Sequence, residues 1–336
     1  MNTNETAGRD APGEKASEPG RFRLGLVGAG RMGRTHLAAI AESRLVTVAG
    51  VAEPDPGARA AVAAGGVPAF ASLAELLSAA EIDGALIAVP TDRHVAVISQ
   101  VMAAGVPALC EKPCGLSVAE ATRCASIAAE AGLMLQVAYW RRFVPALTEL
   151  RNRMLDGELG EVLAVNCYQW DAMPPTAEFR GSSGGIYVDM GVHEFDQVRW
   201  LTGQEFTSVK TAEVAGESDP DCAQIVAELD GGSTAMVSLG RWHPAGDSCK
   251  VEVFGTKGTV SSRFLDPAHG EATFLEALRG QAEDFARAVA GSAAGRPDSP
   301  ASAGSRATGA SVADAIAALR IATLADARAS QLAPSQ

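Results

Sequence analysis

The stretch RFRLGLVGAGRMGRTHLAAIAES, residues 21–43, decides the fold of the first half of the chain. A short apolar run comes first, then Gly28-x-Gly30-x-x-Gly33, then a helical pattern. Gly28 permits a tight turn, Gly30 lets the backbone approach a pyrophosphate, and Gly33 allows the helix to pack closely on the strand. Glu53 closes the next apolar run, twenty positions after Gly33. This spacing predicts a dinucleotide site with the pyrophosphate at the helix N-terminus.

The charges beside this turn bear on the type of dinucleotide. Glu53 can accept both hydroxyls of the adenosine ribose and would repel a 2′-phosphate, which favours NAD. Arg31 and Arg34 could neutralise such a phosphate, so NADP stays open as the alternative. We therefore expect NAD as the cofactor, with NADP less favoured.

Further strand-then-helix patterns follow and end near residue 140. They are LVTVAGVAEPDPGARAAVAA (45–64), EIDGALIAVPTDRHVAVISQVMAAG (81–105) and VPALCEKPCGLSVAEATRCASIAAEAG (106–132), with LMLQVAYW (133–140) as a last strand candidate. Apolar runs that alternate with helices predict a parallel sheet covered on both faces. We expect a doubly wound α/β domain of the Rossmann type, binding NAD, over residues 21–140.

The alternation of strands and helices stops over residues 141–336. After one amphipathic helix, strand-like stretches follow one another, separated by turn signals at residues 230–232 and 255–258. Strands without intervening helices predict an α+β domain with a large open, mostly antiparallel sheet. Such a sheet often offers one face to a partner subunit, so we expect a homodimer or homotetramer formed through it. A Gly/Pro/Ser-rich loop (291–311) precedes a closing helix, VADAIAALRIATLADAR.

Composition excludes several partners. The 336 residues carry a net charge of −12, which argues against nucleic acid or anionic membrane as a partner. No apolar run approaches the length of a membrane span, and residues 1–20 read as a disordered tail without the apolar region of a secretory signal. The six cysteines form no metal-like spacing with the five histidines. We expect free thiols, no metal and a cytoplasmic enzyme.

The segment SSGGIYVDMGVHEFDQVRWLTG (182–203) is the richest in chemistry. On a helix, Asp189, His193, Asp196 and Trp200 would form one stripe, at i, i+4, i+7 and i+11. An aspartate one turn before a histidine suits an acid–base pair, in which the carboxylate orients the ring. Read as structure alone, Asp189 could be a helix cap and His193 a satisfied surface residue.

Lys112 lies just after the apolar run 106–109, at the carboxyl edge where such sheets bind ligands. An alcohol that gives up a hydride must also lose its proton, and an ammonium near the oxygen stabilises the developing alkoxide. Pro113 is expected to fix the turn, where a cis Lys112–Pro113 bond would fit. The alternative is a surface lysine with its stem on apolar surface.

Four motifs together resemble the glucose–fructose oxidoreductase, inositol dehydrogenase and MocA family. They are the glycine motif, the sequence Glu111-Lys112-Pro113, YWRRF (139–143) and SGGIYVDMGVHEFD (183–196). The resemblance covers about residues 21–330 and implies a Rossmann domain followed by an α/β domain with a large open sheet. It also implies that Lys112, Asp189 and His193 form the catalytic group, and that Asp196 binds a substrate hydroxyl.

The resemblance also bears on the remaining site residues. It places Glu111 near the nicotinamide ribose and the segment AVPTDRH (88–94) against the cofactor. The segment RWHPAGD (241–247) lacks the aromatic residue often found before the aspartate in this family, and His243 is expected to take part in substrate binding instead. The expected cofactor contacts are Gly28, Gly30, Arg31, Met32, Gly33, Glu53, Pro90, Thr91, His94, Glu111, Lys112, Trp140 and Arg142. The expected substrate contacts are Lys112, Arg142, Asp171, Asp189, His193, Asp196 and His243.

Together these features predict an NAD-dependent dehydrogenase that oxidises a secondary ring hydroxyl to a ketone. An inositol, myo or scyllo, is the favoured substrate, and a pyranose sugar comes next. One alternative is a reductase of the same family, of the imine, biliverdin or dihydrodiol type. Another is a non-catalytic regulator that senses NAD(P), although such a protein should lack a catalytic side chain and this sequence keeps all three.

Overall fold

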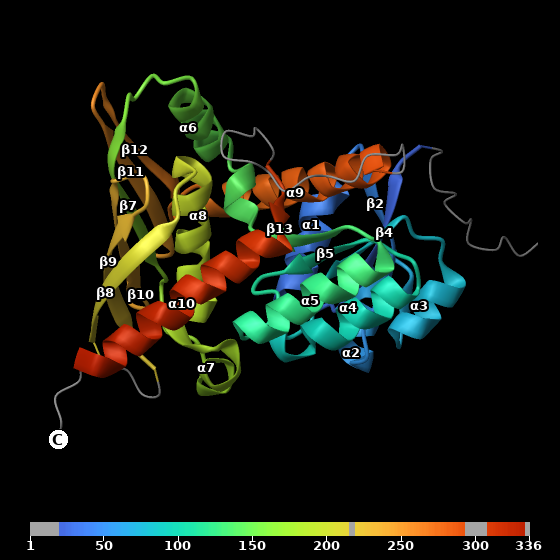
Figure 1. The fold of residues 1–336 in the computed structure, drawn as a ribbon. Helices are drawn as coiled ribbons and strands as arrows, with labels where there is room; N and C mark the ends of the chain where they lie inside the picture. Colours follow the sequence, from blue (N-terminus) through green and yellow to red (C-terminus); the bar gives the residue numbers. More distant parts are fainter. Residues whose placement is uncertain (1–19, 215–218, 293–307, 333–336) are drawn as a thin grey trace, which may run out of the picture.

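Two β-sheets with their helices make up the computed structural model, which describes residues 20–214, 219–292 and 308–332 (Figure 1). The elements up to the end of the first sheet's parallel strands are β1 Phe22–Val27, α1 Arg31–Ala41, β2 Val46–Ala52, α2 Pro56–Ala64, β3 Ala69–Phe70, α3 Leu73–Ala79, β4 Gly84–Ile87, η1 Thr91–Arg93, α4 His94–Ala103, β5 Ala108–Glu111, α5 Val118–Ala131 and β6 Leu135–Ala138. The later ones are η2 Trp140–Phe143, α6 Pro145–Leu155, β7 Val162–Trp170, α7 Ala177–Ser183, η3 Tyr187–Gly191, α8 Val192–Thr202, β8 Phe206–Val214, β9 Cys222–Leu229, β10 Thr234–Gly240, β11 Ser248–Gly255, β12 Thr259–Leu265, α9 Gly270–Ser292, β13 Ala310–Ser311 and α10 Val312–Leu332.

The first sheet has the order β13-β6-β5-β4-β1-β2-β3, and its strands β1 to β6 are parallel. Strand order reverses between β1 and β4, which is the point where such sheets bind nucleotides. The central strands are apolar and fully buried because helices cover both faces. The predicted Rossmann-type domain is confirmed.

The second sheet has the order β12-β11-β7-β10-β9-β8. Its neighbours are antiparallel except for the central pair β7 and β10, which run parallel, so the sheet is mixed. The predicted turns at residues 230–232 and 255–258 join β9 to β10 and β11 to β12. One face of the sheet lies against α8 and α10, and Figure 1 shows no described helix on the other.

The chain returns to the first sheet after completing the second. Helix α9 packs on α1, and its Phe285 meets Phe22 of β1 edge-on with ring centroids 5.9 Å apart. Strand β13 pairs antiparallel with β6, and α10 then runs between α5 and the second sheet (Figure 1). The predicted second unit, residues 141–336, therefore contributes a strand to the first sheet. Most of the expected loop 291–311 and all but Gly20 of the expected tail 1–20 lie outside the described residues.

Two expectations from composition can be compared with the described chain. None of the helices found there has the length and apolar character needed to cross a membrane. All six cysteines are free, as predicted.

Candidate active site

The glycine-rich turn has the shape that a pyrophosphate requires. Gly28 has φ of +96°, and a Cβ there would lie 2.7 Å from the Ala88 carbonyl oxygen. A Cβ on Gly33 would lie 2.1 Å from the Gly28 oxygen, so α1 can approach β1 only with glycine at this position. A Cβ on Gly30 would meet no atom within 4 Å, and no side chain caps the helix there. Open space beside uncapped N–H groups fits a bound dinucleotide.

Glu53 is built into the same corner of the sheet. Its side chain is buried, and its two oxygens accept the backbone N–H groups of Ala29 (2.7 Å) and Asp55 (2.8 Å). These bonds hold the carboxylate at the end of β2, and each oxygen keeps a lone pair for a ribose hydroxyl. Arg31 is exposed, while Arg34 is exposed and donates to the Ala29 oxygen at 3.0 Å.

The loop after β4 brings the next predicted group to this edge. Pro90 is exposed and Thr91 is partly buried. His94 is buried, and its ring nitrogens lie 2.8 Å from the Pro113 oxygen and 2.9 Å from the Val89 oxygen. The ring therefore ties the loop after β4 to the turn after β5, and both nitrogens are engaged by backbone rather than free for a ligand.

Glu111 ends β5 and is buried against α1. Its Oε1 lies 2.6 Å from Nε2 of His36, and its Oε2 accepts the N–H of Lys112 at 3.1 Å. Burial by itself would raise the pKa of Glu111, but the bond to His36 and the nearby positive charges lower it. His36 was not among the residues predicted from the sequence. Its signal was a polar ring on the buried stripe of α1, which also holds Gly33 and Ile40.

Lys112 reaches from this edge of the Rossmann domain to the second domain. The Lys112–Pro113 bond is cis, as predicted. The ammonium donates to the Asp189 backbone oxygen at 2.7 Å and lies 3.4 Å from the Asp189 Oδ1. Both side chains are 18% exposed, so the pair borders open space instead of lying in the core. Two of the three predicted catalytic residues therefore meet.

His193 lies buried beside this pair. Its ring meets Trp140 edge-on, with centroids 6.3 Å apart, and Trp140 packs against Phe274. Burial first, and then the positive charges of Lys112 and Arg141, hold the pKa of His193 well below its usual range. The imidazole is therefore neutral at pH 7 and able to accept a proton.

The predicted orienting bond from Asp189 to His193 is not formed. The Nδ1 atom of His193 has no hydrogen-bond partner in the described part of the chain. Asp189 belongs to the π-helical turn η3, and the α-helix α8 begins only at Val192. A π turn is wider than an α turn, so residues four apart no longer lie above one another. The predicted stripe begins at His193, and Asp189 instead holds Lys112.

Asp171 comes from the second sheet, directly after β7. Its Oδ1 accepts from Gln169 Nε2 at 3.2 Å, and its backbone oxygen accepts the N–H of His243 at 2.9 Å. Burial raises the pKa of Asp171 to about 6, against the Gln169 bond that lowers it. The charges of Asp247 and Asp189 raise it further, and that of Lys112 lowers it. These charges place Asp171 in the neighbourhood of Lys112.

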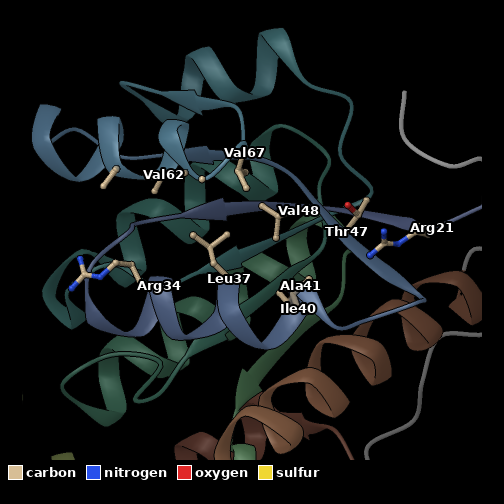
Figure 2. Close-up of a pocket in the computed structure, with 11 residues that line it drawn as sticks. Arg21, Arg34, Leu37, Ile40, Ala41, Thr47, Val48, Val62 and Val67 are labelled. Carbon is tan, nitrogen blue, oxygen red and sulfur yellow. The ribbon is translucent and has the colours of Figure 1, made fainter. Parts of the chain in front are cut away.

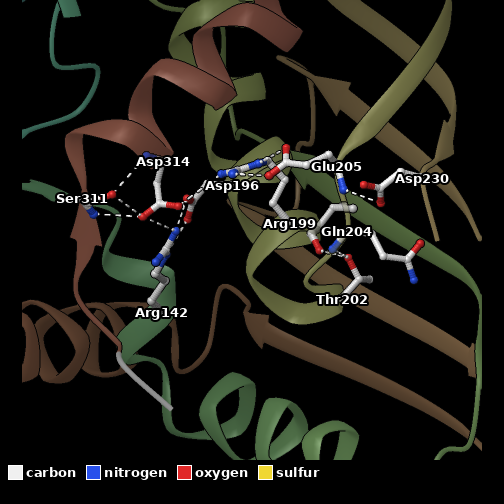
Figure 3. Close-up of polar contacts among 10 residues, drawn as sticks. Arg142, Asp196, Arg199, Thr202, Gln204, Glu205, Asp230, Ser311 and Asp314 are labelled. Carbon is white, nitrogen blue, oxygen red and sulfur yellow. Dashed lines mark hydrogen bonds and ion pairs between the residues drawn. The ribbon is translucent and has the colours of Figure 1, made fainter. Parts of the chain in front are cut away.

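Arg142 and Asp196, both predicted to bind substrate, are paired with each other. Both are buried, and the Arg142 Nε donates to Asp196 Oδ2 at 2.9 Å in a two-pronged pair. Asp314 of α10 approaches the same guanidinium at 3.4 Å and also bonds Ser311 (Figure 3). The cluster joins η2, α8 and α10.

A hollow of about 410 Å³ lies away from these residues, between α1 and α2 over β2. Leu37, Val48 and Val62 line its apolar floor and walls, and Arg21 and Arg34 lie at its ends (Figure 2). Its lining contains no carboxylate, imidazole, thiol or amine, in contrast to the edge between the two sheets.

Comparisons with known proteins agree with this fold. The family model described as an oxidoreductase family with an NAD-binding Rossmann fold matches residues 22–139, and that of the GFO/IDH/MocA C-terminal domain matches residues 147–261. The rhizopine catabolism protein MocA of Rhizobium meliloti is 47% identical over 311 residues, covering 91% of this chain and 94% of that protein. An inositol 2-dehydrogenase of Rhizobium meliloti strain 1021 is 31% identical over 252 residues, covering 73% and 76%.

Solved structures share the whole architecture. A myo-inositol dehydrogenase from Corynebacterium glutamicum has a TM-score of 0.81 at 24% identity and covers 94% of this chain and all of its own. A scyllo-inositol dehydrogenase from Lactobacillus casei, solved with NAD(H) and scyllo-inositol, has a TM-score of 0.80 at 20% identity, with 93% and 97% covered. At these identities the likeness concerns the fold.

Proposed function

This chain belongs to the GFO/IDH/MocA family of oxidoreductases with an NAD-binding Rossmann domain, and we propose that it oxidises a secondary ring hydroxyl of an inositol-type cyclitol to a ketone. One observation carries the proposal. The Lys112 ammonium from the first domain bonds Asp189 of the second, close enough to the neutral His193 ring for its charge to lower the pKa of that ring. An acid–base pair at a nucleotide edge suits alcohol oxidation.

The proposed mechanism assigns each side chain one task. Bound NAD⁺ would supply an acceptor for the hydride at C4 of its nicotinamide. His193 takes the hydroxyl proton as the carbon–hydrogen bond breaks, so a secondary alcohol loses one hydride and one proton and becomes a ketone. Lys112 stabilises the negative charge that develops on the oxygen. Asp189 keeps the ammonium at this spot.

The substrate class rests on the groups around the pair and on the relatives. Asp171 offers a carboxylate that can accept a ring hydroxyl, and Lys112 can donate to one. One relative is an inositol 2-dehydrogenase, and another is named for rhizopine catabolism. We favour myo- or scyllo-inositol, or a cyclitol derived from them, ahead of a pyranose sugar.

A spectrophotometric assay tests this function. Purified protein is mixed with NAD⁺ and, in turn, myo-inositol, scyllo-inositol, D-glucose and D-xylose, and NADH absorbance is followed. We expect turnover with at least one cyclitol, at a higher kcat/KM than with either sugar. Bound NAD with a flat response to every polyol would contradict the proposal and favour a reductase or an NAD-sensing regulator.

For the cofactor, we propose NAD rather than NADP, because the buried Glu53 carboxylate would meet a 2′-phosphate. Glu53→Ala should raise the KM for NAD at least about 10-fold, as charged hydrogen bonds to the ribose are lost. It should also lower the preference for NAD, measured as kcat/KM with NAD divided by kcat/KM with NADP. The exposed Glu42→Ala serves as the charge-matched control. An unchanged ratio would mean that the 2′-hydroxyl is read elsewhere.

We propose further that the uncovered face of the second sheet joins subunits in a homodimer or homotetramer, and that the enzyme works in the cytoplasm. The outward-facing strand residues support the first point, because they include the half-buried Tyr168, Met236 and Phe254 and the exposed Val226. Apolar and aromatic groups of this kind are typical of subunit interfaces.

A further inference from the structure

A line of hydrogen-bonded polar side chains runs from α8 to the end of β7 and stops at Asp171. Glu194 of α8 is buried and forms an ion pair with Arg141, which is also buried. The Arg141 Nη2 donates to Gln169 Oε1 at 2.7 Å, and Gln169 Nε2 donates to Asp171 Oδ1 at 3.2 Å.

The direction of these bonds is dictated by chemistry. A guanidinium can only donate hydrogen bonds, and a carboxylate can only accept them. Gln169 must therefore present its oxygen to Arg141 and its NH₂ group to Asp171. A reversed amide would lose both bonds and leave the buried guanidinium facing a donor. Because Glu194 pairs with Arg141, the guanidinium is held in place, and Gln169 has one favourable orientation.

The pleat of β7 explains why Gln169 can reach Asp171. Residues two apart on a strand point to the same side, so Gln169 and Asp171 follow the inward-facing Val165 and Cys167. Asp171 is the member of this row beyond the end of the strand, where it meets the charges of Lys112, Asp189 and Asp247.

We propose that Gln169 is a positioning residue of the substrate site. Held by Arg141, it fixes one oxygen of Asp171 and leaves the other to accept a hydroxyl of the substrate. It also keeps Asp171 ionised against burial and against its neighbours Asp189 and Asp247, since its hydrogen bond favours the charged form. This inference rests on the proposed cyclitol oxidation for its consequence in turnover, but not for its effect on the Asp171 carboxylate.

The substitution Gln169→Glu tests the hydrogen bond to Asp171 apart from the hydrogen bond to Arg141. A glutamate keeps an oxygen acceptor for Arg141 but loses the donor to Asp171 and sets a second carboxyl group against it. In the pH profile of kcat/KM for the cyclitol, the acidic limb is the range in which activity rises with pH. We expect this limb to move from about pH 6 toward about pH 7 or above, because a second negative charge disfavours ionisation of Asp171. Above the limb, the KM for the cyclitol should rise about 10-fold, more than kcat falls, while the KM for NAD stays unchanged.

Two further proteins complete the test. Gln100→Glu makes the same change on the exposed surface of α4 and should leave the pH profile as in the wild type. Gln169→Met removes the hydrogen bonds to both Arg141 and Asp171. If it folds, the acidic limb of its pH profile should move upward in the same way. A Gln169→Glu protein with the wild-type limb and the wild-type KM for the cyclitol would overturn the inference.

A readout without turnover distinguishes this inference from the proposed function. The side-chain carboxyl carbon of Asp171, labelled with ¹³C and assigned by Asp171→Asn, is titrated by NMR in the NAD complex. We expect its pKa to be higher in Gln169→Glu than in the wild type. An unchanged titration overturns the inference, whether or not any cyclitol is oxidised. A wild-type protein that oxidises no cyclitol contradicts the proposed function alone.

Discussion

At the scale of single residues, the two domains of this oxidoreductase meet through Lys112. The ammonium stands on the carboxyl edge of the first sheet and bonds both the backbone and the carboxylate of Asp189. A lysine held in this way is a fixed positive charge beside a neutral imidazole. Such a charge lowers the energy of an alkoxide more than that of the alcohol, so its effect belongs to the transition state.

Lys112→Ala should therefore reduce kcat by on the order of 10²–10⁴-fold in the NAD-dependent oxidation of the cyclitol. NAD affinity, measured by titration calorimetry, should stay within about 3-fold of the wild type, because the glycine turn and Glu53 are untouched. The control is Lys257→Ala, in the exposed turn between β11 and β12, which should retain full activity. Undiminished turnover in Lys112→Ala would remove this residue from the mechanism.

The pH dependence of the wild type should report Asp171 and not His193. Asp171 has its pKa raised to about 6, so it gains the charge needed to accept a hydroxyl as pH rises through 6. His193 has its pKa well below its usual range and stays neutral over the same interval. We expect kcat/KM to rise tenfold per pH unit below about 6 and to level off above it. Asp171→Asn should give a lower kcat/KM without this limb; a limb that persists would assign it to another group.

At the scale of helices and strands, a cluster of three charged side chains holds three elements together. Arg142 of η2 and Asp196 of α8 pair with each other, and Asp314 of α10 lies beside them (Figure 3). Since α10 crosses from the second sheet to the first, this cluster lies where the chain joins its two halves.

Asp196→Ala should lower the free energy of unfolding by about 3 kcal/mol, because it leaves the buried Arg142 charge with only the more distant Asp314. Glu158→Ala breaks the exposed pair with Arg153 and should cost less than about 1 kcal/mol. Urea denaturation followed by circular dichroism measures both. If the two variants lose equal stability, the cluster does not hold these elements together.

Much of this architecture could be predicted from periodicity, because each strand and helix carries its own pattern. The glycine turn, Glu53 and Lys112 could be placed because they follow strands, and parallel strands end at one edge. The π turn at Tyr187–Gly191 could not, since one extra residue per turn leaves no trace in composition. It is this turn that separates Asp189 from His193. The partners of His36 and Gln169 were equally hidden, because they come from distant segments of the chain.

At the scale of the whole molecule, the second sheet is covered on one face only among the described elements (Figure 1). The returning segment β13–α10 explains the asymmetry, because α10 packs against β8 and α8 on the side nearer the Rossmann domain. Apolar side chains gathered on the free face of a sheet are typical of an interaction surface.

We expect the wild type to be a dimer or tetramer in sedimentation-velocity experiments. Val226, 54% exposed on β9, lies on the free face between Lys210 and Met236 of the neighbouring strands. Val226→Glu should shift the protein to a smaller species, because a carboxylate placed in a subunit interface loses its water without gaining a partner. Leu45→Glu changes a comparably exposed apolar residue in the Rossmann domain and should leave the assembly intact. A monomeric wild type, or a Val226→Glu protein that assembles as the wild type does, would show that subunits do not join through this face.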